Sequence, residues 1–413
     1  VSDKILVKKR SWSFVIHFMR IAIKVKPSVE KIIRKGHPWL FENGITKVSK
    51  EGKAGDLAII FDNKKNKFLA IGLYDPYSPI RVKILQSNQS ATINEAWFES
   101  KIQTAYDKRL PLLQTETNSY RLIYGENDGL PSLIADVYDD VLVLKIYSLI
   151  WLRYLDVLQP ILLKISQCKT LVLRLSRNVE QQKTELNGLY NGQVLHGVLE
   201  NETIIFTEHG LKFQANVIKG HKTGYFLDHR HNRKKVGELA KGKTILDVFS
   251  YAGGFSVHAL AGGAKEVVSL DISKQALALS KENAALNPHR GTHKTMAVDA
   301  FEGLENLRQA GKKFDVVIID PPSFAKKDTE KERALKSYGR LAKLGVQLVA
   351  KNGILLLASC SSRVTADDFF ETVLPIVQNS KRPFHIMEKT FHDIDHPITF
   401  REGAYLKSIY LQF

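Results

Sequence analysis

The sequence predicts an α/β protein in which a small β-barrel and an α+β module precede a doubly wound sheet. The chain has 413 residues, more than one domain usually holds, so two or three domains are expected. Short β-rich runs between Gly and Pro turns fill residues 19–88, a pattern typical of a small barrel. From about residue 219, strands alternate with helices, which indicates a sheet covered on both faces.

The N-terminal end does not follow the pattern of the first domain. Residues 1–18 are interpreted as an extension, and Met19, which opens an alternating run, is expected to be the natural start. His17 and Arg20 interrupt the nearby apolar patch and no small-residue cleavage site follows, so no signal peptide is expected. No apolar run reaches the roughly 18 residues of a membrane span, and a cytoplasmic protein is expected.

The strongest compositional signal is a formal net charge of +17. Residues 1–35 hold ten Lys and Arg residues against Asp3 and Glu30, which is nearly half of the whole excess. Charge of this size and placement indicates a partner rich in phosphate, such as a nucleic acid. A generally basic surface kept for solubility is the alternative.

The first two domains are predicted from β-rich and helix-like runs. In the barrel, residues 19–88, strands are expected over Arg20–Val25, Asp56–Phe61, Phe68–Tyr74 and Ile80–Leu85. In the α+β module, residues 89–215, helices are expected over Ala91–Leu112 and Leu149–Lys164, with a strand over Thr170–Leu175. Two strand pairs are also expected there: Leu133–Val137 with Val141–Ile146, and Gly192–Leu199 with Glu202–Glu208. The turn-rich loop 124–131 is either a plain connection or a binding loop.

The last domain, residues 216–413, is predicted from its alternation. Strands are expected over Thr244–Phe249, Glu266–Leu270, a short run before Asp299, Phe314–Ile319 and Gly353–Ala358. Helices are expected over Phe255–Ala261 and Ser273–Leu286. In such a sheet the ligand lies beyond the carboxyl ends of the strands. Carboxylates stand at successive strand ends, at Asp247, Asp271, Asp299 and Asp320. We therefore expect the ligand site there.

The turn after the first strand indicates which ligand to expect. Gly253 and Gly254 lack side chains and would let a ligand approach the backbone. They do not form the GxGxxG turn that holds a pyrophosphate, which disfavours a nicotinamide dehydrogenase. Asp247 would repel phosphate and attract a cation, while Asp271 would bind ribose hydroxyls and Asp299 an adenine amine. A cationic nucleoside without phosphates fits this set, and S-adenosylmethionine (SAM) is such a molecule.

Two further strand ends carry candidate chemistry. Pro321 and Pro322 stiffen the turn after Asp320, and Phe324 is placed to stack on an extruded base. A rigid turn capped by Asp320 is the alternative. Cys360 ends the fifth strand, beside the Asp320 turn and hydroxyl groups, where a thiolate would be stabilised and nucleophilic. The alternative for Cys360 is a small buried apolar residue.

The cysteine count excludes two other classes of protein. Cys168 and Cys360 are too few for a disulfide scaffold. Neither lies in a CxxC motif and no HExxH motif occurs, so no metal is assigned. Cys168 closes a helix-like run in the middle module and is interpreted as a structural residue.

The motifs together resemble one family. The stretch from Gly220 to Arg230, followed by DVFSYAGGFSVHAL, SLDIS, IDPPSF and ASCSS, is similar to the class I RlmI-like rRNA large-subunit methyltransferases. The resemblance runs from about residue 19 to the end and includes a PUA-like barrel. It implies a Rossmann-like methyltransferase sheet, SAM as cofactor, large-subunit rRNA as partner and 5-methylcytosine as product. A homodimer is left open.

The residues and the resemblance together give a set of cofactor-binding candidates. Lys222 is expected to meet the methionine carboxylate and Asp228 its amine, with a solvated charge as the alternative for Lys222. Phe249 and Ile272 are expected to enclose adenine, with burial in the core as their alternative. The whole set is Lys222, Thr223, Phe226, Asp228, Asp247, Phe249, Ser250, Gly253, Phe255, Asp271, Ile272, Asp299, Ala300 and Asp320.

The implied chemistry uses Cys360 and Asp320 as catalytic residues. Attack of the Cys360 thiolate on carbon 6 of cytosine would turn carbon 5 into a nucleophile, and Asp320 would bind the base edge. Related RNA cytosine methyltransferases carry a second cysteine where this chain has Pro321-Pro322, so the acceptor of the carbon-5 proton is unassigned, with water and a nearby carboxylate as candidates. The alternatives are methylation of an RNA base nitrogen with Cys360 idle, and a non-catalytic RNA-binding factor of ribosome assembly.

Overall fold

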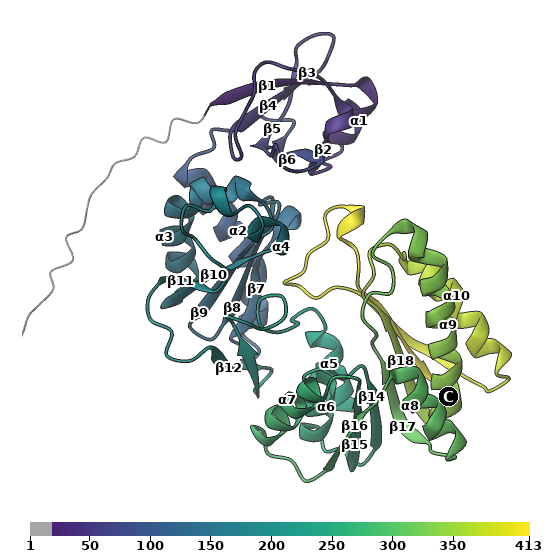
Figure 1. Ribbon diagram of the computed structural model, residues 1–413. Helices are drawn as coiled ribbons and strands as arrows, with labels where there is room; N and C mark the ends of the chain where they lie inside the picture. The colour runs from purple at the N-terminus through teal and green to yellow at the C-terminus, as the bar shows by residue number, and fades with distance from the viewer. Residues whose placement is uncertain (1–18) are drawn as a thin grey trace, which may run out of the picture. The chain divides into compact units, whose positions relative to one another are not determined.

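The computed structural model describes residues 19–413, which fall into two compact units (Figure 1). The first unit ends at Ala91 and the second covers Thr92–Phe413. The predicted N-terminal extension, residues 1–18, lies outside the described residues. Because the second unit contains both the middle module and the last domain, the boundary expected between residues 215 and 216 stays a prediction.

The first unit is a six-stranded sheet with one short helix, α1 (Pro27–Arg34). Ile21, Ile23 and Val25 alternate with more exposed residues along the first strand and are fully buried, which explains the period-two pattern of the sequence. The strands run in the order β2 (Trp39–Phe41), β6 (Ile80–Ser87), β5 (Phe68–Tyr74), β4 (Leu57–Phe61), β1 (Arg20–Val25), β3 (Ile45–Val48).

The second unit begins with a five-stranded sheet and its helices. Helix α2 (Glu95–Leu113) starts later than predicted because the Asn94 side chain accepts a hydrogen bond from the Trp97 amide and caps it. The predicted helix from residue 149 is a 3₁₀ turn, Leu149–Tyr154, followed by α3 (Leu155–Ser166). The strand order is β11 (Gln193–His196), β10 (Thr170–Leu175), β9 (Val141–Ile146), β8 (Leu133–Tyr138), β7 (Ser119–Tyr124).

One predicted strand pair is wrong. Residues Gln193–His196 pair with β10, and β12 (Thr203–Glu208) pairs instead with β13 (Leu211–Asn216). The link between β12 and β13 is the two-residue turn His209-Gly210, in which both residues have positive φ. Such a turn matches the twist of paired strands, so it selects this hairpin over the longer connection.

The turn-rich loop 124–131 carries structural contacts. A 3₁₀ turn, Gly125–Asp128, places the Asp128 carboxylate against the buried Arg109 guanidinium at 2.6 Å. The Asn127 side chain accepts a hydrogen bond from the Thr399 amide at 2.8 Å. The loop therefore fixes α2 and the segment after residue 390 to the same sheet.

The C-terminal part is the predicted doubly wound sheet; it has seven strands, of which β19 and β20 were not indicated by the sequence. Five neighbouring strands pair in parallel, and β20 runs antiparallel to both β18 and β19. The order is β16 (Thr292–Ala297), β15 (Glu266–Asp271), β14 (Thr244–Val248), β17 (Phe314–Ile319), β18 (Val349–Ser359), β20 (Lys407–Gln412), β19 (His385–Thr390).

Helices cover both faces of this sheet (Figure 1). One face packs against α5 (Arg230–Leu239), α6 (Gly254–Ala261) and α7 (Lys274–Ala285). The other packs against α8 (Ala300–Gln309), α9 (Lys331–Leu348) and α10 (Ala366–Asn379). Leu246 belongs to one core and its neighbour Ile245 to the other, as alternation in a doubly covered strand requires. None of the helices within residues 19–413 is both long and apolar enough to cross a membrane.

Candidate active site

Three reactive side chains meet at the carboxyl edge of the seven-stranded sheet. Asp320 follows β17, Cys360 follows β18, and His229 caps the start of α5. The Cys360 Sγ lies 3.5 Å from the Asp320 Oδ1 and 3.6 Å from the His229 Nε2. The His229 Nε2 is 3.3 Å from the same Asp320 oxygen. The structure thus brings together the two predicted catalytic residues and adds a histidine.

His229 was not identified from the sequence, although its neighbour Asp228 was. Its Nδ1 is 3.1 Å from the Asn232 Nδ2, and its ring packs edge-on against Phe255. Burial lowers the pKa of His229, but the negative charge of Asp320 and its hydrogen bond raise it more, so the pKa lies above its ordinary value. A histidine between a cysteine and an aspartate is recognisable only once the fold has joined three distant segments.

The thiol environment differs from the prediction. Burial raises the pKa of Cys360 well above its ordinary value, and the negative charges of Asp320 and Asp228 raise it further, while Lys407 lowers it. This direction is opposite to the one expected for a stabilised thiolate in the protein alone. The Cys360 S–H group donates to Asp320, so the proton already points at an acceptor.

Asp228 lies at the same edge and is held by an aromatic hydroxyl. The Tyr405 hydroxyl donates to the Asp228 Oδ2 at 2.8 Å. Burial raises the pKa of Asp228, but the charges of His229 and His396, this hydrogen bond and Arg121 lower it more, so the carboxyl stays ionised. Asp228 is thus a second carboxylate whose charge acts on Cys360.

The environment of Asp247 is the one expected of a carboxylate that binds a cation. Its Oδ2 accepts hydrogen bonds from the Ser256 hydroxyl at 2.6 Å and the Ser256 amide at 3.1 Å. Its Oδ1 is buried and finds no hydrogen-bond partner among residues 19–413. Burial raises the pKa of Asp247 to about 7 against these hydrogen bonds, and the charge of Asp320 adds to the rise. An ammonium group would satisfy the free oxygen.

The raised pKa predicts how SAM affinity depends on pH. Below about pH 7 the Asp247 carboxyl is neutral, and above it the carboxylate attracts the SAM ammonium, so affinity should rise as the pH increases through 7. Asp247→Asn should weaken binding about 10- to 100-fold and flatten this profile. Titration calorimetry between pH 6 and 8 measures both effects. 5′-Methylthioadenosine, which lacks the amino-acid ammonium and carboxylate of SAM, is the comparison ligand, and an equally steep profile for it would contradict this role.

The predicted ribose and adenine residues lie around the next strand end. The Asp271 carboxylate accepts hydrogen bonds from the Tyr251 and Ser273 amides, both at 2.9 Å, which holds it at the end of β15. Ile272 is 73% exposed, so it lies outside the core and free to cover a planar ring. Phe249 has φ +63° and is half-buried, with its ring 6.4 Å from that of Phe324. These positions fit a nucleoside.

Other members of the predicted set have protein partners. Asp299 caps α8 by accepting from the Phe301 and Glu302 amides, and Ala300 follows it, buried. Thr223 is buried and donates to Asp136 at 2.5 Å. Their roles toward a cofactor stay predictions. The remaining members are Lys222, exposed, Phe226, half-buried, Phe255, buried, and Ser250, which is buried with a hydroxyl unpartnered among the described residues.

The glycine turn has a different cause from the one predicted. Gly253 has φ +76°, and an added Cβ would lie 2.0 Å from the Ser280 Oγ. A Cβ on Gly254 would lie 2.7 Å from both the Arg233 Cδ and the Tyr225 hydroxyl. These glycines are therefore required by backbone conformation and by neighbouring protein side chains, and close approach of a ligand is not needed to explain them.

The catalytic cluster also has the composition of a metal site. The ligand atoms of His229, Asp320 and Cys360 lie within 4.8 Å of one another. A divalent ion there would coordinate the Cys360 thiolate, and the sulfur would then not be free for the attack that the predicted chemistry requires. The absence of a metal from the reaction stays a prediction.

The fold and site together define a SAM-dependent methyltransferase. The sheet reverses only at β20, carboxylates stand at the strand ends without a pyrophosphate turn, and Asp247 has a buried oxygen with no partner among residues 19–413. Residues 128–397 match the family model of the S-adenosylmethionine-dependent methyltransferases, and residues 23–87 match that of the PUA-like domain. The chain uses SAM as its cofactor, and its first unit is a PUA-like domain.

Comparison with related sequences assigns the chain to a narrower family. It is 41% identical to a Ribosomal RNA large subunit methyltransferase of Deinococcus radiodurans, over 95% of this chain and 97% of the relative. It is 34% identical to Ribosomal RNA large subunit methyltransferase I of Shewanella denitrificans, over 95% and 99%. The chain belongs to the family of ribosomal RNA large subunit methyltransferases.

Solved structures show the same fold. A Streptococcus mutans protein described as a SAM-dependent methyltransferase superposes with a TM-score of 0.79 at 22% identity, covering 95% of this chain and all of that chain. A methyltransferase solved with SAH superposes with a TM-score of 0.80 at 21% identity, covering 96% and 100%. At this level of identity the likeness concerns the fold.

Proposed function

We propose that this protein methylates carbon 5 of a cytosine in large-subunit rRNA through a covalent adduct on Cys360. The observation that carries the proposal is the Cys360 thiol, which lies within 3.6 Å of both an acid–base carboxylate and an imidazole at the cofactor edge of the sheet. The two relatives named above act on large-subunit rRNA according to their names. SAM, when bound, supplies an electrophilic methyl group on a sulfonium sulfur.

The contacts suggest where the thiol proton goes. The Cys360 S–H donates to the Asp320 Oδ1, so Asp320 is the group that accepts this proton as the sulfur attacks carbon 6. The protonated Asp320 then donates to ring nitrogen 3, which neutralises the charge that the new carbon–sulfur bond creates there. Carbon 5 becomes an enamine carbon and takes the methyl group.

His229 supports this transfer as a positioning residue. The His229 Nε2 faces both the Asp320 Oδ1, at 3.3 Å, and the Cys360 Sγ, at 3.6 Å. One N–H group there donates to the carboxylate before the proton transfer and to the thiolate as the proton leaves the sulfur. To finish the reaction a base removes the carbon-5 proton, and the carbon–sulfur bond breaks with its electron pair returning to sulfur. The proton on ring nitrogen 3 then returns through Asp320 to the Cys360 thiolate. Asp228 and water are the candidates for that base.

A trapping experiment tests the covalent route. RNA transcribed with 5-fluorocytidine in place of cytidine cannot lose a proton from carbon 5, so the adduct should accumulate with SAM and survive denaturation. Mass spectrometry should place the link at Cys360. Methylation of a base nitrogen would give product and no adduct, and a non-catalytic assembly factor would give neither. Mapping methylated nucleosides in rRNA from a deletion strain then identifies the target.

The charge of the first unit suggests how the RNA is held. Lys24, Lys26, Lys31, Arg34 and Lys35 follow one another along the first strand and helix, and all but Lys24 are exposed or nearly so. We expect the isolated unit, residues 19–91, to bind RNA mainly through phosphates. The logarithm of its affinity in filter binding should therefore fall linearly with the logarithm of salt concentration. An affinity that does not change with salt would contradict phosphate contacts.

A further inference from the structure

The segment that joins β19 to β20, residues 391–406, lies beside the nucleophile. Ser359 pairs with Lys407 and Thr390 pairs with Ser408, so the segment leaves and re-enters the sheet next to the position of Cys360. A connection of this length without regular structure beyond one short 3₁₀ turn is uncommon in a compact domain unless it has a function.

Buried charges hold this segment in one conformation. The Asp395 Oδ2 accepts hydrogen bonds at 3.0 Å from both the Arg121 amide and the Arg230 guanidinium. The same guanidinium also contacts Asp393 at 3.3 Å. The His392 Nε2 accepts from two backbone amides near the end of the segment, at 3.3 Å and 3.1 Å. The segment is thus preorganised.

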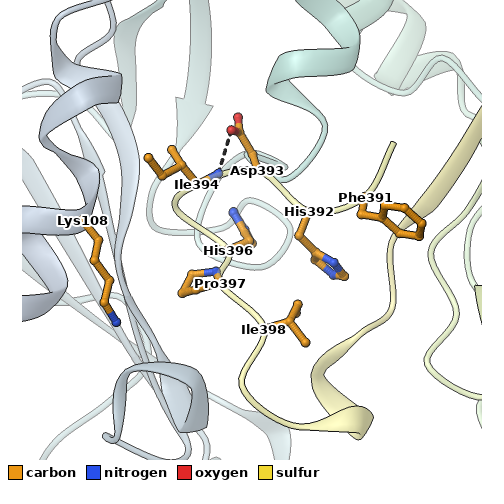
Figure 2. A pocket seen from close by; sticks show the side chains of 8 residues that line it. All are labelled: Lys108, Phe391, His392, Asp393, Ile394, His396, Pro397 and Ile398. Carbon is orange, nitrogen blue, oxygen red and sulfur yellow. Dashed lines mark hydrogen bonds between the residues drawn. The ribbon is translucent and has the colours of Figure 1, made fainter. Parts of the chain in front are cut away.

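This fixed segment nevertheless presents large apolar side chains to solvent. Phe391 is 47% exposed, Ile394 42% and Ile398 38%. Apolar side chains that a rigid backbone holds outward beside a nucleophile have the character of a binding surface. They belong to a pocket of about 590 Å³, whose other lining residues are Lys108, His392, Asp393, His396 and Pro397 (Figure 2).

The charge in the pocket suits a base with its phosphate. Burial lowers the pKa of His392 to about 3, so its ring is neutral. Asp393 is already paired with Arg230, and the carboxylate beside Lys108, Asp128, is already paired with the buried Arg109. The Lys108 ammonium, half-exposed at the pocket wall, therefore keeps charge for an anion.

We propose that the segment Phe391–Ile398 is a stacking platform for an unpaired nucleobase of the RNA substrate, with Lys108 meeting the adjoining phosphate; this rests on the proposed function. A target base in folded RNA must leave its stack before it reaches Cys360, and its neighbours lose stacking partners. Apolar and aromatic side chains replace that stacking without regard to sequence. The platform supplies such side chains beside the nucleophile.

The test compares kinetics on deproteinised rRNA from a deletion strain. The double variant Phe391→Ser/Ile398→Ser should raise the KM for rRNA about 10- to 100-fold and leave the SAM affinity and the rate of iodoacetamide labelling at Cys360 unchanged. Ile205→Ser removes a side chain of similar exposure, 49%, from the β12–β13 hairpin and should behave as wild type. Lys108→Gln should make the KM less dependent on salt.

Any one of the following results would contradict the proposed stacking role of Phe391–Ile398. An unchanged KM for the double variant would exclude stacking. A KM that rises only with ribosomal particles as substrate would assign the surface to a ribosomal protein. Loss of SAM affinity together with the KM change would mean a structural role. The kinetic assay counts methyl groups on any atom of the RNA. A wrong 5-methylcytosine assignment would therefore appear separately, in nucleoside analysis of the wild-type product.

Discussion

Cys360→Ala should lower methyl incorporation into rRNA by about ten-thousand-fold or more, because the proposed route to carbon 5 begins with a bond to the Cys360 sulfur. The carboxylate and the imidazole that contact the thiol, Asp320 and His229, are weaker nucleophiles and are not expected to replace it. Single-turnover assays with radiolabelled SAM measure the loss. SAM affinity should stay within about twofold of wild type, because the cofactor residues belong to other strand ends.

Cys168→Ala is the matched control. Cys168 lies in the loop between α3 and β10, is 8% exposed, and burial raises its pKa to about 11. Its thiol faces the Ser166 carbonyl at 4.0 Å, whereas that of Cys360 faces a carboxylate and a histidine, so the variant should turn over as wild type. Turnover by Cys360→Ala close to that of wild type would remove the covalent mechanism and leave methylation of a base nitrogen as the favoured reaction.

Asp320→Asn should lower kcat about 100- to 1,000-fold while the KM for rRNA changes little. Asparagine keeps the size of the side chain but can neither take the thiol proton nor pass it to the base. The thiol would then lose its nearest acceptor, and its pKa should fall because a negative charge has gone. The pH dependence of iodoacetamide labelling at Cys360 measures this fall in the thiol pKa. Labelling at neutral pH should become faster while turnover becomes slower.

Opposite changes in turnover and in thiol reactivity distinguish a catalytic role of Asp320 from misfolding of the variant. A misfolded variant would lose turnover without a lower thiol pKa. Asp328→Asn is the control, because the Asp328 carboxylate is 82% exposed and its cation, Arg363, is also on the surface. If Asp320→Asn turns over normally, the carboxylate only orients the turn, and the proton must leave through His229.

Much of the fold could be predicted because its signals are local. Strand Phe314–Ile319 was placed without error, since a short run that is apolar except for Asp315 and is bounded by polar residues favours a strand buried on both faces. The carboxylates at strand ends were found for the same reason, because parallel strands bring their ends to one edge. The hairpin at His209-Gly210 was missed because only these two turn residues indicate it, whereas the longer run over residues 192–199 was predicted as the partner of β12.

Residues whose role depends on distant partners could not be predicted. His229 looked like a polar residue at a helix start, and it became part of the site only when β17 and β18 brought Asp320 and Cys360 to it. The thiol pKa was predicted in the wrong direction because the burial and charge that set it come from segments far apart in the sequence.

The sequence by itself determined the alternation of strands and helices, the basic first domain and the acidic groups at the strand ends, because periodicity, charge and turn chemistry act within a few residues. Tertiary structure alone decided that β19 and β20 complete the sheet, that Asp247 keeps one oxygen free, and that an apolar segment stands beside Cys360. Pairing, burial and electrostatic fields depend on distances in space, and these exist only once the chain has folded.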